Sequence, residues 1–435
     1  MRNLVLFLII LMFAACSEEP AVTSLSPEEA VAYFRKIEQA CEKDSGSLWG
    51  QQLYGPVMFI DRNTRSIIAN QGDSNGYLKE KDGIYTGTYP RERIINNTAA
   101  DFGGTIFAMS PLPPRDDRFD YRMLTRALHS LYHRHQFLNG IPPDVFNISS
   151  MDETQARIWI KLEWEALRKA INTEGEDKKL AIRDALIFRG SNREAYPLES
   201  DDQNRFETYE GLATFTYIKL ASASREEFLD RLFAYLDNIM GYQSFARSYG
   251  FIHGALYATL LEDMGFDFTS IRTGDTDLGQ LVRNLYDIEL PDVCRDVAGS
   301  LAFNYDIDKI REDEVQRAVD IKERLYKQVS VYTEKPVVFF ELESPYFDFE
   351  PEDVHSLDTI GTLYTSMRVS DNWGKLTVDK GGCLVSYNYK SMRITAKGLK
   401  EDRNHISGEG WNLILNGDWE LTNVNQNYFI RKFIP

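Results

Sequence analysis

The spacing of apolar residues changes twice along the chain, and each spacing predicts a different kind of structure. Residues 45–117 contain short apolar runs punctuated by Gly, Asn and Asp, such as 57–60 and 105–109, which are typical of strands. From residue 118 to 332, apolar side chains recur three and four positions apart, which predicts amphipathic helices. After residue 335 the period becomes two, which predicts strands at 337–340, 363–365, 375–378, 392–395 and 411–415.

This pattern predicts an α+β protein in two units. Residues 26–334 are expected to form a mainly helical domain with a small N-terminal β-sheet, and residues 335–435 a C-terminal all-β domain. Signals for helix ends support the helical part. We expect three capping boxes and one glycine stop, at Ser26-Pro27-Glu28-Glu29, Ser150-Met151-Asp152-Glu153, Ser224-Arg225-Glu226-Glu227 and Gly265.

The first residues predict an exported, lipid-anchored protein. An apolar run at 4–13 follows a short basic start and is too short to span a membrane, so residues 1–15 read as a signal peptide. Phe13-Ala14-Ala15-Cys16 resembles a bacterial lipobox, which implies a diacylated Cys16 on a tether of residues 16–25. The alternative is an ordinary secretory signal with a chance cysteine. The lipobox implies the cell envelope, with the outer membrane expected and its face left open; Ser17-Glu18-Glu19 resembles an acidic surface-export signal.

Composition excludes several classes of function. The chain has 435 residues, with 49 Lys+Arg against 66 Asp+Glu and a net charge of −17, which argues against nucleic-acid partners. The same charge argues against electrostatic docking on anionic lipid. Four cysteines are too few for a disulfide framework, and we interpret Cys41, Cys294 and Cys383 as small buried side chains.

One histidine pair suggests metal chemistry. His129 and His133 stand four residues apart, and on a helix this spacing places both imidazoles on one face, where they can reach one Zn²⁺. Metallopeptidases of this design have glutamate directly after the first histidine, where it deprotonates the metal-bound water. This chain has Ser130 at that general-base position. The alternative is a pair of helix-surface histidines without a metal.

A downstream segment offers the third ligand. The run from Glu207 to Phe215 resembles the EGLAxY/F helix that carries the third zinc ligand of gluzincins, which implies a metal site of His129, His133 and Glu210. A carboxylate completes a His₂Glu site and leaves one position open. Two other carboxylates, Glu163 and Glu165, remain alternatives.

The resemblance covers most of residues 45–420. The run His129-Ser130-Leu131-Tyr132-His133-Arg134-His135-Gln136 is similar to the HELFHRxQ helix of uncharacterised bacterial gluzincin-like, thermolysin-like lipoproteins. The shared motifs outside this helix are Leu48-Trp49-Gly50, Tyr54-Gly55-Pro56, Asn97-Thr98-Ala99, Leu162-Glu163-Trp164, Trp373-Gly374-Lys375-Leu376 and Gly408-Glu409-Gly410-Trp411. The resemblance implies a gluzincin-like metallopeptidase fold for residues 26–334 and zinc as the cofactor.

The serine at position 130 determines whether the predicted metal site is expected to be catalytic. A serine hydroxyl cannot act as the base that glutamate provides, and losing a general base costs about 10²–10⁴-fold in rate. We therefore expect a degenerate or inactive metallopeptidase that binds a peptide, a protein or another envelope component. Two alternatives remain. One is an active zinc-dependent hydrolase in which Glu207 or Glu163 activates water, and the other is a structural lipoprotein without a metal site.

Overall fold

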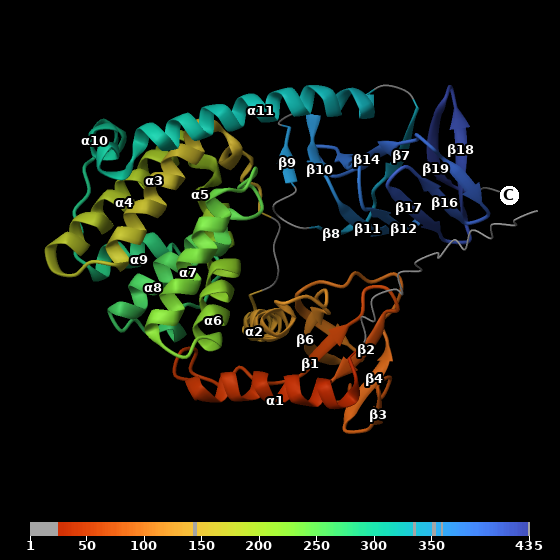
Figure 1. Cartoon of the computed structure of the whole chain (residues 1–435), viewed down its shortest axis with the longest axis horizontal. Coiled ribbons are helices and arrows are strands. Elements are labelled where there is room, and N and C mark those ends of the chain that lie inside the picture. Colours follow the sequence, from red (N-terminus) through yellow and green to blue (C-terminus); the bar gives the residue numbers. More distant parts are fainter. Residues whose placement is uncertain (1–24, 142–145, 334–335, 350–353, 358–359, 434–435) are drawn as a thin grey trace, which may run out of the picture.

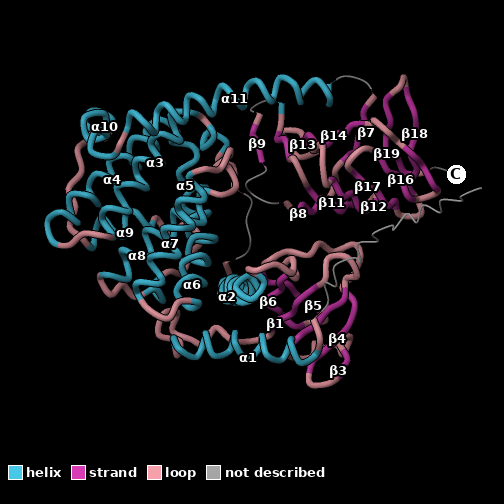
Figure 2. Tube along the Cα trace, in the orientation of Figure 1, coloured by secondary structure: helices cyan, strands magenta, loops and turns pink. Residues whose placement is uncertain are grey.

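The computed structural model describes residues 25–141, 146–333, 336–349, 354–357 and 360–433 (Figure 1). The predicted signal peptide and Cys16 lie outside these residues. The α+β class is confirmed, and helices and strands are segregated along the chain (Figure 2). The helices are α1 (Pro27–Asp44), α2 (Phe119–Leu138), α3 (Thr154–Ile171), α4 (Gly175–Ala195), α5 (Ser200–Phe206), α6 (Leu212–Ala221), α7 (Arg225–Met240), α8 (Tyr249–Asp263), α9 (Leu278–Leu285), α10 (Arg295–Leu301) and α11 (Ile307–Thr333).

The N-terminal sheet has the strand order β3-β4-β2-β1-β6-β5. Its strands are β1 (Val57–Ile60), β2 (Ser66–Ala69), β3 (Lys79–Lys81), β4 (Ile84–Thr88), β5 (Thr98–Phe102) and β6 (Thr105–Pro111). Strands β1 and β6 pair in parallel, and the other pairs are antiparallel. Side chains alternate between the faces: Val57 and Phe59 face the helices, whereas Met58 and Ile60 join a second apolar cluster.

Helix α1 covers one face of this sheet. Phe34 of α1 stacks on Phe59 of β1 with ring centroids 5.4 Å apart. The predicted capping box is confirmed, because Ser26 accepts from the Glu29 N–H and the Glu29 carboxylate accepts from the Ser26 N–H. Helix α2 lies between this sheet and the other helices (Figure 1), so one helix contacts both parts.

Two C-terminal sheets enclose a separate apolar cluster. Their orders are β18-β19-β7-β14-β13-β10-β9 and β15-β16-β17-β12-β11-β8, and their inner faces share a core that includes Trp373 and Trp411. All five predicted strand runs are observed. The strands are β7 (Val337–Glu341), β8 (Tyr346–Asp348), β9 (Val354–Ser356), β10 (Thr362–Tyr364), β11 (Met367–Asp371), β12 (Gly374–Val378), β13 (Cys383–Val385), β14 (Ser391–Thr395), β15 (Lys400–Asp402), β16 (His405–Gly408), β17 (Trp411–Leu415), β18 (Trp419–Val424) and β19 (Asn427–Lys432).

One predicted helix start is wrong and another is half right. Ser150 lies in a 3₁₀ turn at Ser149–Asp152, where its hydroxyl and N–H bond Glu199 instead of capping α3. Ser224 does cap α7 by accepting from the Glu227 N–H, but the Glu227 carboxylate accepts from the Ala223 N–H. Gly265 has a φ of +67° just past α8, as a glycine stop requires.

Candidate metal centre

Helix α2 brings the histidine pair together. Apolar side chains on α2, including Leu128 and Leu131, are buried, and so are His129 and His133, which lie one turn apart on another side of the same helix. Both imidazoles are buried, and their Nε2 atoms lie 2.8 Å apart. The two histidines are therefore not a pair on the helix surface, as one alternative had it, because their rings meet inside the molecule.

Glu210 meets the two imidazoles from a different element. Its Oε2 lies 3.4 Å from the His129 Nε2 and 3.3 Å from the His133 Nε2. The three ligand atoms lie within 4.8 Å of one another, and within the described residues they form the one group of this kind that could hold a metal ion. The structure thus brings together the three residues that the sequence singled out.

A π-helical turn, η3 (Glu207–Gly211), presents Glu210. Turns of this kind are rare, occur mostly inside α-helices and are frequently found at functional sites. Helix α8 packs closely against η3, since a Cβ placed on Gly211 would come 2.5 Å from the Gly254 Cα and 2.7 Å from the Gly250 carbonyl oxygen. Glycine at 211 therefore permits this close approach, and two glycines of α8 provide the matching surface.

Gln136 fixes the orientation and the tautomer of His133. Its Nε2 donates to the carbonyls of Thr208 and Tyr209, at 3.3 and 3.1 Å, which leaves its Oε1 as an acceptor. That Oε1 lies 2.8 Å from the His133 Nδ1, which must therefore carry the proton. The Nε2 lone pair of His133 then faces His129 and Glu210, which is the tautomer that a metal requires. Gln136 also ties α2 to the turn that carries Glu210.

The electrostatics of this cluster favour a cation. Burial lowers the pKa of His129, and the neighbouring His133 lowers it further. Burial alone would raise the pKa of Glu210, but the two imidazoles outweigh it and lower that pKa to about 2. The Glu210 Oε2 is buried without a hydrogen-bond partner among the described residues. Two imidazole nitrogens and one carboxylate oxygen are a donor set that suits Zn²⁺.

Aromatic rings enclose the histidine pair. Tyr209 stacks on His133 at 4.5 Å between centroids, while Tyr217 and Phe251 lie 5.9 and 6.2 Å from His129. These rings and Gln136 were missed from the sequence. Gln136 had a usable signal, because it stands three residues after His133 on the same helix face. The rings had none, because they reach the site from η3, α6 and α8.

Ser130 points towards the sheet. Its hydroxyl donates to the Met109 carbonyl of β6 at 2.8 Å and lies 3.2 Å from the Ser110 hydroxyl. The side chain is fully buried, so it links α2 to the strand beneath it. A hydroxyl that donates to a backbone carbonyl has no role as a base in this arrangement.

The alternative carboxylates are engaged elsewhere. Glu207 forms a two-pronged ion pair with Arg189, at 2.9 and 2.7 Å, and Glu163 accepts from the Tyr257 hydroxyl at 2.6 Å. Both acids are buried in a network that also contains His253. Glu165 lies on the partly exposed side of α3, 3.5 Å from Arg168. Glu210 is therefore the carboxylate that the structure places at the histidine pair.

Two other groups of residues lie inside the molecule. His253 is fully buried in α8 and accepts from the Trp164 Nε1 at 2.9 Å. Cys41, Cys294 and Cys383 are buried and free, as the sequence predicted.

A cleft of about 520 Å³ lies between the N-terminal sheet and the C-terminal domain. Ala99 and Ala100 of the edge strand β5 line one side, and Tyr346 of β8 lines the other. Tyr209, which stacks on His133, is hydrogen-bonded to Thr98 at the start of β5. Strand β5, which lines the cleft at Ala99 and Ala100, therefore also contacts the aromatic ring that stacks on His133 of the candidate metal centre.

Comparisons of the chain with protein-family models, curated proteins and solved structures gave no match. In the part of the chain that the structure describes, no helix has the length and apolarity needed to cross a membrane.

Proposed function

We propose that the chain is a lipid-anchored envelope protein that holds Zn²⁺ at His129, His133 and Glu210 and binds a peptide or another envelope component without efficient hydrolysis. The observation that carries the metal assignment is the unpartnered Glu210 Oε2, which faces two buried imidazole nitrogens. A buried carboxylate oxygen without a donor is costly, and a shared cation is the partner that would relieve all three groups.

Each residue has a distinct part in this proposal. His129, His133 and Glu210 would hold the ion, and Gln136 would keep His133 in the metal-binding tautomer. These three ligand residues would hold a zinc ion that supplies Lewis-acid chemistry towards a carbonyl or a water. Glu207 is paired with Arg189 and Ser130 bonds a carbonyl, so neither supports general-base catalysis. The lack of a base at these two positions supports binding without efficient turnover, and the resemblance to gluzincins supports the metal site.

The test is metal analysis of the chain lacking residues 1–22, which retains every described residue. We expect about one zinc per chain after reconstitution at neutral pH, lost in His129→Ala and in Glu210→Gln. His405→Ala is the matched control, because His405 is an exposed histidine of β16 and its loss should leave zinc content unchanged. A wild-type chain that retains no zinc would remove the metal assignment and leave a structural lipoprotein.

Peptide turnover separates the remaining alternatives. The zinc-loaded chain is incubated with a mixed peptide library, and cleavage is followed by mass spectrometry. We expect binding of peptides with negligible cleavage. Efficient cleavage that disappears on chelation and in His129→Ala would instead identify an active hydrolase and show that another group replaces the missing glutamate.

A further inference from the structure

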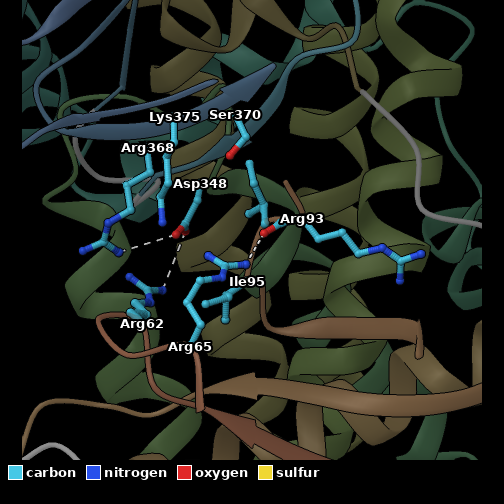
Figure 3. A pocket seen from close by; sticks show the side chains of 9 residues that line it. Arg62, Arg65, Arg93, Ile95, Asp348, Arg368, Ser370 and Lys375 are labelled. Atoms are coloured by element: carbon cyan, nitrogen blue, oxygen red, sulfur yellow. Dashed lines mark hydrogen bonds and ion pairs between the residues drawn. The ribbon is translucent and has the colours of Figure 1, made fainter. Parts of the chain in front are cut away.

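A basic pocket lies between the two β-rich parts of the molecule, away from the histidine pair. Arg62 and Arg65 reach it from the turn between β1 and β2, and Arg368 and Lys375 reach it from β11 and β12 of the C-terminal domain (Figure 3). These four cationic side chains gather around one carboxylate, Asp348 of β8. Arg93 also lines the pocket, but Figure 3 shows its guanidinium pointing away, where it donates to the Asp101 carbonyl.

The positive charge in this pocket is poorly compensated. Asp348 lies 3.6 Å from Arg62 and 3.6 Å from Arg368, which is longer than the 2.7–2.9 Å of a direct charged hydrogen bond. Arg65 donates to the carbonyls of Tyr89, Pro90 and Arg93, which hold its guanidinium without neutralising it.

Among the residues that line the pocket, the single carboxylate of Asp348 thus faces three arginines and one lysine. The exposed Glu92 also acts on Arg65, but it is not among the residues that line this pocket. This imbalance occurs in a chain whose overall charge is −17, so it is a local feature of the pocket.

Two further observations point to a missing partner. The Arg62 Nε is buried and has no hydrogen-bond partner among the described residues. Burial, together with Arg65 and Arg368, lowers the pKa of Lys375 to about 8, although Asp348 acts in the opposite direction. A lysine whose pKa is lowered by neighbouring arginines, beside a buried donor that stays unpaired, is an arrangement that a bound anion stabilises.

The backbone holds the two arginines of the turn in place. Asp61 accepts from the N–H groups of Asn63 and Thr64, at 2.8 and 2.7 Å, and closes the turn between β1 and β2. Arg65 has a φ of +62°, a conformation that side chains other than glycine adopt at a cost of about 1 kcal/mol or more. The turn therefore keeps a strained residue whose guanidinium faces the pocket.

The pocket adjoins the cleft beside the metal centre. Both are lined by Arg93, Ile94 and Ser370, so a ligand in the larger cleft can bring one end to the edge of the basic pocket, whose own free volume is about 10 Å³. The remaining cleft lining includes the rings of Tyr89 and Tyr346, which can pack against an organic body attached to that end.

We propose that this pocket binds a phosphate-type dianion, either free or as the end group of a ligand lying in the cleft. Four cations facing one carboxylate are better matched by two negative charges than by the single charge of a carboxylate ligand. Arginine forks bind phosphate oxygens in pairs, and lysine adds a mobile point charge. The site uses none of the metal ligands, so it stands or falls independently of the zinc assignment.

The test is isothermal titration of the chain lacking residues 1–22 with sodium phosphate, at constant ionic strength in a chloride buffer. We expect saturable binding of about one phosphate per chain. Lys375→Met should weaken this binding about 10- to 100-fold, which is the effect of losing one charge-assisted hydrogen bond. Arg368→Met should act in the same way, and it supplies a second variant in case one substitution disturbs folding.

The matched control is Lys390→Met, which removes an exposed lysine from the same domain. It should bind phosphate as the wild type does. Wild-type protein without saturable binding, or equal loss in Lys390→Met and Lys375→Met, would overturn the proposal. Acetate binding as tightly as phosphate would overturn the selectivity for a dianion.

Phenyl phosphate distinguishes the two sources of the dianion. Binding tighter than that of inorganic phosphate would indicate an end group on a larger molecule in the cleft, and equal binding would indicate free phosphate. Circular dichroism of each variant at the titration temperature verifies that the chain is folded.

Discussion

Replacing Gln136 with methionine tests whether the centre is pre-organised for a metal. Methionine has nearly the same length and shape but can neither accept from the His133 Nδ1–H nor donate to the carbonyls of Thr208 and Tyr209. His133 would then be free to turn and to exchange tautomers. Glu210 would lose the tie that holds its turn, η3, against α2.

The structure sets the size of two separate effects. Three hydrogen bonds at about 1 kcal/mol each predict that Gln136→Met lowers the free energy of unfolding of the metal-free chain by about 2–3 kcal/mol. Loss of the group that orients a metal-binding histidine predicts zinc affinity that is 10- to 100-fold weaker, about 1.4–2.7 kcal/mol. Urea denaturation measures the first effect, and competition with a chromophoric zinc chelator measures the second.

The control is Gln316→Met, at an exposed glutamine of α11 whose side chain bonds Asp320 on the same helix. It should change neither quantity. If Gln136→Met lowered stability as expected but left zinc affinity within twofold of the wild type, the tautomer argument would be refuted, because Gln136 would then serve the fold alone. The reverse result would mean that the three bonds add nothing to stability.

Three further changes have defined outcomes. Ser130→Glu should give zinc-dependent peptide cleavage above that of the natural chain, because a general base contributes about 10²–10⁴-fold; a folded, zinc-loaded variant without this gain would count against position 130 as the missing base. Lys375 has a folded-state pKa of about 8 against the ordinary 10.5, so between these pH values the unfolded chain binds more protons than the folded chain. Burying the charged lysine therefore lowers the free energy of unfolding, and this loss is complete below pH 8. Lys375→Met in phosphate-free buffer should therefore raise the free energy of unfolding at pH 7 by about 1–2 kcal/mol after allowance for partial exposure, and urea denaturation should show this gain vanishing towards pH 10.5. Cys16→Ala should leave the precursor unprocessed and abolish fatty-acid labelling in cells, and normal labelling would exclude the lipobox.

Local sequence signals predicted much of the fold because they act over a few residues. The alternation in 392–395 and 411–415 gave strands at the observed places, since each pattern directly reports which side chains face the core. The capping box at Ser26 formed for the same reason. Ser150 failed because Glu199, far along the chain, captured the same hydroxyl and N–H, and a local motif contains no information about such a competitor.

The three candidate metal ligands were predictable from the sequence, because helix spacing and motif resemblance identify them. The pair His129 and His133 follows from the period of a helix, and Glu210 from the similarity of its surroundings to a known ligand helix. The engagement of Glu163 and Glu207 with other partners could not be read from the sequence. It depends on Arg189, which reaches the interior from α4 and meets these acids only in the folded chain.

The π-helical turn explains why two glutamates three residues apart have different partners. In an α-helix, residues three apart lie on nearly the same face, so Glu207 and Glu210 would compete for one environment. Hydrogen bonds of the i to i+5 type widen η3 and separate the two side chains around its axis. Glu207 then pairs with Arg189 in the buried network, and Glu210 turns to the histidines. Glu207, the alternative to the missing base, is therefore held in an ion pair by the same turn that positions the candidate metal ligand. This geometry is the strongest argument for expecting binding without turnover.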